Sequence, residues 1–502
     1  MTTLIPTRED QRLAAIRDLL TEGQRTARQR RRPVLVSIGE PLAGVDPLSA
    51  FAAAEPRQRA YWEHQEPDGG ARIAIAGIGA ASTIRVEGAR RFAGAATAWS
   101  ELLDGALIEH VDNQVHGDPI LMGGFSFDPA RPRTADWEPF PDGMLLLPRL
   151  MLAATDAGCR LTLNYLLTHE TVIEQEVSQL ARLRDWIARL PAAEPDAADY
   201  STPEGLQLEE SIPGARWQGL VAETTREIRE GRYAKVVLAR QARLHLPATP
   251  GAQAAGALRR LRANYPGNFL FAVAMPGHQA TTDGSGRESI FLGATPERLL
   301  RMKGDIVETT VLAGSARRGA TPEEDQRIGS ELLANAKDRQ EHAVVAMMLR
   351  MSLAGYCRGL DAPEAPTLLR LPNVQHLYTP VRGHLDGAHS ILELVARLHP
   401  TPAVGGFPRQ MALRVIRQRE GLDRGWYAGP VGWLDRHGQG EFAVAIRSAL
   451  LRTRQTPTVA DEPEGTEALL FAGCGIMGDS DPAREYAESR IKMQAMLAAL
   501  AG

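Results

Sequence analysis

Apolar and polar residues follow two different periods along the chain. In the first 200 residues, alternation predicts strands in VLVSIGE, ARIAIAGIG and RLTLNYLL, and helical spacing predicts a helix in VIEQEVSQLARLRDWIARL. The glycines of Gly77-Ile78-Gly79, followed by the strand-like TIRVEG, predict a hairpin. The N-terminal part therefore contains strands and helices.

The second part of the chain mixes helices and strands without a regular order. The periods predict a helix in WQGLVAETTREIREG, a strand in YAKVVLARQARLHL, a helix in QAAGALRRLRANY, and strands in NFLFAVAM and SIFLGAT. Because neither a regular β-α-β alternation nor a repeat emerges, the pattern predicts an α+β fold with a mostly antiparallel sheet.

One connecting segment divides the chain unequally. Residues 191–214 are rich in proline, alanine and acidic residues, which is typical of a connection. We expect an N-terminal region at residues 1–200, where few clustered titratable groups suggest chemistry, and a catalytic region at residues 201–502.

Charge balance, cysteine spacing and the lack of long apolar runs argue against several classes of protein. The 502 residues include 57 Lys and Arg against 61 Asp and Glu, so there is no basic excess for a nucleic-acid partner. Cys159, Cys357 and Cys474 are far apart, which argues against a disulfide framework or a thiolate zinc site. The N-terminus lacks the apolar core of a signal peptide, and no apolar run has membrane-spanning length. We expect a cytoplasmic protein without a membrane partner.

A glycine motif near the C-terminus has the form of a dinucleotide-binding turn. Gly473, Gly475 and Gly478 spell G-x-G-x-x-G between a strand and a helix. Only about two dozen residues follow, too few for a second parallel strand, and Asp479 and Asp481 would repel a pyrophosphate. The glycines instead permit close approach of a carboxylate or phosphate to backbone N–H groups.

The last helix carries acidic residues on one face. Asp481 is the expected N-cap and Pro482 the first helical residue. Glu485, Glu488 and Lys492 are spaced three and four residues apart, so their side chains project from the same face.

A second acidic pair lies in TPEEDQRIGSELLANAKDRQEHAVVAMMLRM, for which we predict one helix. Asp338 and Glu341 have the same three-residue spacing there. If the two pairs faced each other across a cleft, their oxygen atoms would select magnesium over zinc. The spacing alone favours the alternative, which is two solvated helix faces with intrahelical Glu–Lys pairs.

Nine motifs after about residue 205 resemble, in the same order, those of the chorismate-utilising enzyme family. This family includes isochorismate, salicylate, anthranilate and aminodeoxychorismate synthases. The resemblance implies one large fold of antiparallel sheets wrapped by helices, with the cleft between two halves, so the two regions form one intertwined unit. The motifs are YAKVVLAR, FLGATPERLL, ETTVLAGSARRG, AKDRQEHAVV, NVQHLYTPVRG, LHPTPAVGGFP, DRGWYAGPVGWLD, GEFAVAIRSALL and FAGCGIMGDSDPAREYAESRIK.

The resemblance also implies a set of ligand contacts. Glu341 and Glu488 correspond to the family's Mg²⁺ ligands, with Asp338 and Glu485 near them, and the metal would hold the ring carboxylate of chorismate. Arg447 and Lys492 would bind the substrate's carboxylates. The other implied substrate contacts are Tyr427, beside the enolpyruvyl arm, and Gly314, Ser315, His376, Ala403, Ile446, Gly473 and Gly475.

Lys235 and Glu297 match the family's positions for a base that activates water and an acid that protonates the departing hydroxyl. As a base, Lys235 must be uncharged, and apolar neighbours such as Val236, Val237 and Leu238 would lower its pKa. As an acid, Glu297 must stay protonated, and burial would raise its pKa.

Three cues distinguish the family's reactions. Lys235 stands where ammonia-using members carry glutamine, which favours water as the nucleophile. Residues 311–315, VLAGS, lack the nucleophilic lysine of the P-I-K-G-T motif in aminodeoxychorismate synthases. AGSARR, PAVGGFP and the long N-terminal region favour an isochorismate synthase over a salicylate synthase. Since siderophore-pathway isochorismate synthases are usually shorter, the length of the chain favours the menaquinone pathway.

The expected activity is therefore Mg²⁺-dependent conversion of chorismate to isochorismate. A salicylate synthase, a siderophore-pathway isochorismate synthase and a catalytically silent relative remain alternatives. The sequence leaves open whether the protein is a monomer or a homodimer.

Overall fold

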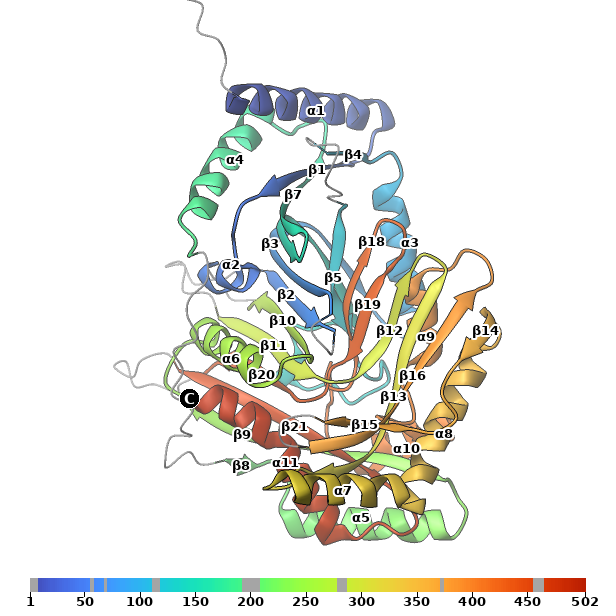
Figure 1. The fold of residues 1–502 in the computed structure, drawn as a ribbon. Coiled ribbons are helices and arrows are strands. Elements are labelled where there is room, and N and C mark those ends of the chain that lie inside the picture. Colours follow the sequence, from blue (N-terminus) through green and yellow to red (C-terminus); the bar gives the residue numbers. More distant parts are fainter. Residues whose placement is uncertain are drawn as a thin grey trace, which may run out of the picture.

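A computed structural model gives the arrangement of the chain (Figure 1). Helices α1 and α4 lie at one end of the molecule, α5 and α7 lie at the other, and strands fill the space between them. The structure describes residues 8–54, 58–66, 70–110, 118–191, 208–277, 287–370, 374–454 and 465–502.

The strands form one hydrogen-bonded sheet that branches at β6 (Gly143–Thr155). One edge of β6 pairs with β3 (Arg72–Val86), and its other edge pairs with β5 (Ile120–Phe125) and β7 (Gly158–Leu167). Beyond β7 come β1 (Val34–Leu42) and β4 (Leu107–His110). Among the described strand pairs only β1–β4 is parallel, so the predicted α+β fold with mostly antiparallel pairing is confirmed.

Two arms of the sheet extend from this branch point. The first leads from β3 through β2 (Arg59–Gln65), β10 (Phe269–Pro276), β11 (Glu288–Thr295), β20 (Ser448–Thr453) and β21 (Thr466–Ile476) to β9 (Lys235–Leu246). The second leads from β5 through β18 (Pro430–Asp435), β19 (Gly440–Val444), β12 (Arg298–Lys303) and β13 (Ile306–Arg317) to β16 (Val374–Leu385).

Shorter strands and helices complete the fold. The short strands are β8 (Glu209–Glu210), β14 (Cys357–Asp361), β15 (Thr367–Arg370) and β17 (Gly406–Phe407). The helices are α1 (Arg8–Arg30), α2 (Pro47–Ala53), α3 (Arg91–Leu103), α4 (Ile173–Ala188), α5 (Gly214–Arg229), α6 (Pro250–Asn264), α7 (Pro322–Ala334), α8 (Ala336–Leu353), α9 (Ile391–Leu398), α10 (Arg409–Arg419) and α11 (Pro482–Ala501). None of the described helices is long and apolar enough to cross a bilayer.

Strands from the first 200 residues connect both arms. β2 pairs with β10 in one arm, and β5 pairs with β18 in the other. Of the predicted connecting segment, residues 192–207 lie outside the described residues, and the remainder includes β8 and the start of α5. On these pairings we propose that the regions before and after residue 200 form one intertwined unit.

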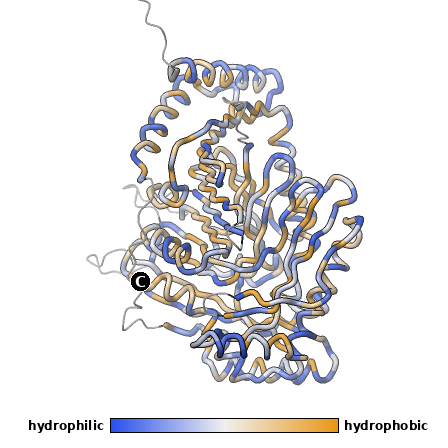
Figure 2. The backbone as a smooth tube through the Cα atoms, viewed as in Figure 1, coloured by the Kyte–Doolittle hydropathy of each residue, from blue (hydrophilic) through white to orange (hydrophobic). Residues whose placement is uncertain are grey.

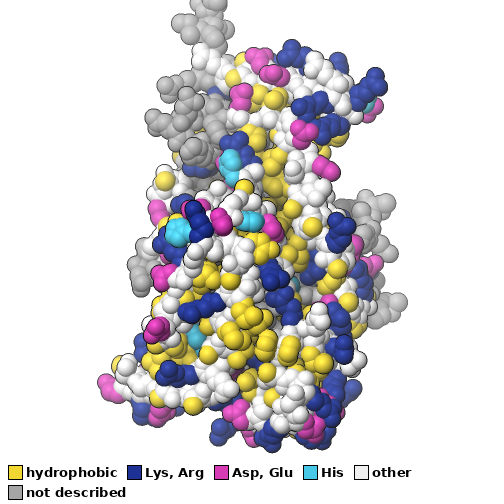
Figure 3. All heavy atoms as spheres, turned by 90° about the vertical axis from the view of Figure 1, so that its right-hand side faces the viewer, with side chains coloured by type: hydrophobic (Ala, Val, Ile, Leu, Met, Phe, Trp, Pro, Cys, Tyr) yellow, Lys and Arg dark blue, Asp and Glu magenta, His cyan; other side chains and the backbone are white. Residues whose placement is uncertain are grey.

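Hydrophobic residues concentrate on the central strands, whereas the outer helices α1 and α4 carry many hydrophilic residues (Figure 2). Trp62, Trp217 and Trp426 are among the largest fully buried side chains. α8 is an exception, because Met347 and Met351 on it are exposed. It lies on the right of Figure 1, and hydrophobic side chains gather in the lower half of that face (Figure 3).

The predicted helix that carries Asp338 and Glu341 is interrupted. α7 ends at Ala334, and Asn335 caps α8 by accepting hydrogen bonds from the N–H groups of Lys337 and Asp338. Asparagine is a strong N-cap residue and a poor helix-interior residue, which explains the break. The interruption places Asp338 in the first turn of a new helix.

The predicted hairpin at Gly77-Ile78-Gly79 is wrong. β3 continues through these residues and pairs with β6 along its whole length, with a register shift between Ala80 and Ser82. Gly79 has φ +65° next to this shift, a conformation that glycine adopts readily at bulges. The remaining predicted elements are confirmed as β1, β7, α4, α5, β9, α6, β10, β11 and α11.

Candidate active site

A cavity lies between the two arms of the sheet. β9 and β21 from the first arm and β13 and β16 from the second contribute wall residues, and α8 and α11 supply charged side chains. Every predicted site residue except Lys235 lines this cavity. These residues are Glu297, Gly314, Ser315, Asp338, Glu341, His376, Ala403, Tyr427, Ile446, Arg447, Gly473, Gly475, Glu485, Glu488 and Lys492.

Two glycines of β21 line one wall of the cavity, where the absence of a side chain leaves space. Gly473 lies opposite Ala239 of β9, and Gly475 lies opposite Val237. A Cβ atom on Gly475 would come within 2.8 Å of Lys235 Cε and 3.0 Å of Glu341 Oε1. β21 pairs antiparallel with both β9 and β20. This topology differs from a β-α-β dinucleotide-binding turn.

Lys235 lies behind this wall and is only 1% exposed. Its Nζ atom donates a hydrogen bond to Glu341 Oε1 at 2.6 Å. This contact joins a strand of the first arm to α8 and ties the position of the amine to that of a predicted metal ligand. Val236 and Leu238 belong to the hydrophobic core, and because they follow Lys235 by one and three positions in a strand, they point to the opposite face.

Glu297 follows β11 in a short connection to β12 and is 5% exposed. Burial raises the pKa of Glu297 to about 7, although the positive charges of Lys235 and Lys492 oppose that shift. The direction agrees with the prediction of a protonated acid.

The acidic residues of α8 and α11 approach one another at the cavity. Burial and the charges of Glu341 and Glu488 raise the pKa of Asp338 to about 6. Burial and the charge of Glu488 raise the pKa of Glu485 to about 7. Burial also acts on Glu341, but the charge and hydrogen bond of Lys235 hold its pKa below the usual range. Carboxylates that repel one another in this way fit a divalent cation with oxygen ligands.

A thiol lies next to two of these acids. Possible ligand atoms of Cys474, Glu485 and Glu488 lie within 4.8 Å of one another. Burial raises the pKa of the Cys474 thiol well above its usual value, and its sulfur lies 3.3 Å from the carbonyl oxygen of Glu485. Because a metal binds the thiolate and not the thiol, the oxygen donors are the candidate ligands.

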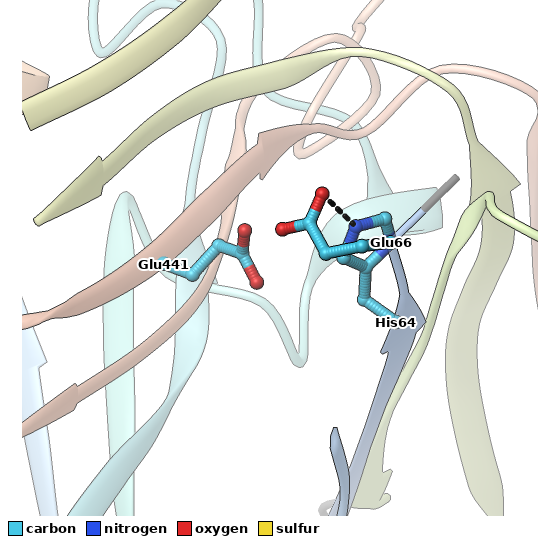
Figure 4. Close-up of side chains that lie close together, drawn as sticks. All are labelled: His64, Glu66 and Glu441. Atoms are coloured by element: carbon cyan, nitrogen blue, oxygen red, sulfur yellow. Dashed lines mark ion pairs between the residues drawn. The ribbon is translucent and has the colours of Figure 1, made fainter. Parts of the chain in front are cut away.

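A second group of possible ligands lies elsewhere, at His64, Glu66 and Glu441 (Figure 4). Here Arg298 already supplies a cation, because it donates to Glu441 Oε1 at 2.8 Å and to Glu66 Oε1 at 2.6 Å. Arg301 also pairs with Glu66. This group is a buried ion-pair network of the sheet, and its charges are already balanced.

Two cationic side chains, Arg447 and Lys492, line the same cavity as the acids. Among the described residues the guanidinium of buried Arg447 has no hydrogen-bond or ion-pair partner, which suits an anionic ligand. Lys492 pairs with Glu488 at 2.7 Å and donates to the carbonyl of Gly473 at 3.0 Å. Both cations line the cavity, and the family resemblance implies that they bind the substrate's carboxylates.

His376 offers a further ligand contact. Its Nδ1 lies 2.9 Å from Ser315 Oγ, and its buried Nε2 has no partner. Burial and the charges of Arg447 and Lys492 lower the pKa of His376 to about 3. The imidazole is therefore neutral and can bond to a ligand through Nε2.

Further cavity residues were not predicted from the sequence. Phe471 is one of them, and the predicted Tyr427 stacks on it with ring centroids 5.1 Å apart. Lys337, next to Asp338, and Arg424, in DRGWYAGPVGW, also line the cavity. Both lie in motifs that were recognised, so the motifs were the available signal.

The cavity combines clustered carboxylates with buried cations, as expected for an enzyme that binds an anionic substrate with a divalent cation. A profile of the family described as "Chorismate binding enzyme" matches residues 21–501. The chain belongs to this family.

Relatives in this family match nearly the whole chain. A "Salicylate biosynthesis isochorismate synthase" of Pseudomonas aeruginosa is 39% identical over 93% of this chain and 90% of its own length. "Isochorismate synthase MenF" of Bacillus subtilis is 34% identical over 95% of each chain. The solved menaquinone-specific isochorismate synthase MenF of Escherichia coli has a TM-score of 0.71 and 26% identity, and the match covers 96% of this chain and 99% of that one.

Magnesium should stabilise the fold more strongly at alkaline pH. Asp338 and Glu485 have raised pKa values in the folded protein, so between about pH 4.5 and 7 the folded state binds more protons than the unfolded state. The stability that these groups contribute to the metal-free protein therefore falls as pH rises through that window. Because Mg²⁺ competes with those protons, we expect it to raise the melting temperature more at about pH 8 than at about pH 5.5.

Differential scanning fluorimetry with and without MgCl₂ measures this difference. Glu488→Gln should abolish the Mg²⁺-dependent shift, whereas Glu323→Gln on α7, away from the cavity, should retain it. Equal shifts at both pH values, or a full shift in Glu488→Gln, would contradict the assignment.

Proposed function

We propose that this chain is an isochorismate synthase that converts chorismate into isochorismate. One observation carries the proposal: Lys235, at the position where ammonia-using relatives have glutamine, lies beside the same cavity as buried Glu297. Water is then the nucleophile. The relatives named isochorismate synthase, which match over 93% and 95% of the chain, support the same activity.

The reaction exchanges one hydroxyl for another on the substrate ring. A water oxygen adds at C2 and gives up a proton to Lys235. The ring double bonds shift, the C4–O bond breaks, and the C4 hydroxyl leaves as water with the proton of Glu297. Lys235 must be uncharged when water attacks, because only the free amine can accept this proton. One water enters and one leaves, so product and substrate are isomers.

Binding roles follow from the cavity walls. Glu341 and Glu488, with Asp338 and Glu485 near them, would hold Mg²⁺, which when bound neutralises and orients the ring carboxylate. Arg447 and Lys492 bind the carboxylates by charge-assisted hydrogen bonds. The other contacts are Gly314, Ser315, His376, Ala403, Tyr427, Ile446, Gly473 and Gly475.

Menaquinone synthesis is the proposed destination of the product. The likeness to MenF of Bacillus subtilis and to solved MenF of Escherichia coli supports it. The Pseudomonas aeruginosa relative carries a name from salicylate biosynthesis and matches over a similar length, so chain length does not separate the two pathways. All three cysteines are free, which is consistent with the proposed cytoplasmic location.

The reaction products decide between the proposal and its alternatives. Purified protein incubated with chorismate and MgCl₂ should release isochorismate, without pyruvate and without a need for ammonia. Chromatographic separation of the products measures this. Salicylate with pyruvate would identify a salicylate synthase, and no turnover would identify a catalytically silent relative.

Removing the Lys235 amine should abolish turnover. For Lys235→Ala we expect kcat to fall roughly 100- to 10,000-fold, since the general base is lost, while near-ultraviolet circular dichroism stays unchanged. Lys303→Ala, at the end of β12 and outside the cavity, is the matched control and should keep its rate. A near-normal rate in Lys235→Ala would remove this residue from the mechanism.

A further inference from the structure

β9 has an incomplete outer edge directly after Lys235. On its inner edge β9 pairs with β21 from Val236 to Leu246. On its outer edge β17 pairs with Lys235 and Val236, and β8 pairs with Ala242 and Arg243. Between these two short strands, the outer backbone groups of β9 require other partners.

An ion pair supplies those partners. Arg424 Nη2 donates to the carbonyl of Val237 at 2.8 Å, and Glu420 Oε2 accepts from the N–H of Ala239 at 2.9 Å. Arg424 also donates to both carboxylate oxygens of Glu420, at 2.7 and 2.6 Å. The two side chains therefore occupy the place of a missing strand segment.

The same arginine holds a second backbone segment of the cavity. Its Nη1 donates to the carbonyl of Val404 at 3.0 Å, next to Ala403. Gly405 O accepts from Val237 N–H at 3.0 Å, so residues 401–405 and β9 are joined at this point. The backbone carbonyl of Arg424 accepts from Tyr427 N–H at 2.8 Å. Two parts of the cavity wall thus meet at one guanidinium, and the backbone of the same residue contacts a third.

The Glu420–Arg424 ion pair is buried, so the surrounding atoms fix the positions of both side chains. Arg424 is 2% exposed and its guanidinium lies 4.3 Å from the centre of the Phe127 ring. Burying two charges is a costly way to gain stability, because an apolar pair of similar volume often stabilises a fold equally well. What an apolar pair cannot supply is a planar fork that bonds two carbonyls and a carboxylate at once.

We propose that the Glu420–Arg424 pair positions Lys235 and the 401–405 loop around one substrate. Lys235 precedes Val237 by two residues, so a shift of β9 at Val237 moves the amine as well. Arg424 is a positioning residue here, and its role rests on the proposed function of the cavity.

Arg424→Lys tests this proposal. Lysine keeps the charge but has a single nitrogen that cannot serve Val237, Val404 and Glu420 together. We expect kcat to fall roughly 10- to 100-fold, as for small misplacements of catalytic groups, with KM changed by less than about threefold. Amide hydrogens in residues 234–240 and 401–407 should exchange faster in this variant.

Arg59→Lys is the matched control. Arg59 is also 2% exposed and pairs with buried Glu288, and neither residue lines the cavity. This variant should lose comparable thermal stability yet keep kcat within about twofold of the wild type. Equal losses of kcat in both variants, or an unchanged kcat in Arg424→Lys, would overturn the positioning role.

If Arg424→Lys does not fold, a second variant tests the same proposal. Glu420→Gln keeps an oxygen for Ala239 N–H and loses the charge, so kcat should fall in the same direction by a smaller factor, and a full rate would overturn the proposal. Wild-type turnover is measured in parallel. If the wild type forms no isochorismate, the proposed function fails, while the exchange comparison between Arg424→Lys and Arg59→Lys still tests the backbone clamp.

Discussion

Repulsion among carboxylates dominates the electrostatics of the cavity, because two helices from distant parts of the chain bring their acidic side chains together there. α8 packs against β13, and α11 packs against β21, so the sheet fixes where the acids meet. Lys235 pairs with Glu341 and Lys492 pairs with Glu488. Burial and the neighbouring glutamate charges raise the pKa values of Asp338 and Glu485. The folded protein therefore holds several carboxylates close together, and a bound divalent cation would neutralise their negative charge.

The rest of the fold keeps those groups in place. The branch of the sheet at β6 joins the arm that ends in β9 to the arm that ends in β16, and the cavity opens between them. Gly475 leaves room for the contact between Lys235 and Glu341, and Gly473 leaves room beside the Tyr427 hydroxyl. Burial of Glu297 raises its pKa, which suits the acid role proposed for it.

Local sequence patterns predicted many of the helices and strands, because strand alternation and helix capping act over a few residues. β9 and the Asp481 cap of α11 are examples. The site residues came from motif resemblance. The partner of Lys235 could not be predicted, since Glu341 is 106 positions away. The bulge beside Gly79 escaped prediction because pairing with β6 decides between a hairpin and a continuous strand. The break at Asn335 is a local cap that the prediction of one helix overlooked.

Anomalous diffraction from crystals grown with Mn²⁺ in place of Mg²⁺ would test the central claim most directly. The account predicts one strong peak in the cavity, bonded to carboxylate oxygens of Glu341 and Glu488. A peak at His64, Glu66 and Glu441 with none in the cavity, or no peak at saturating Mn²⁺, would contradict it.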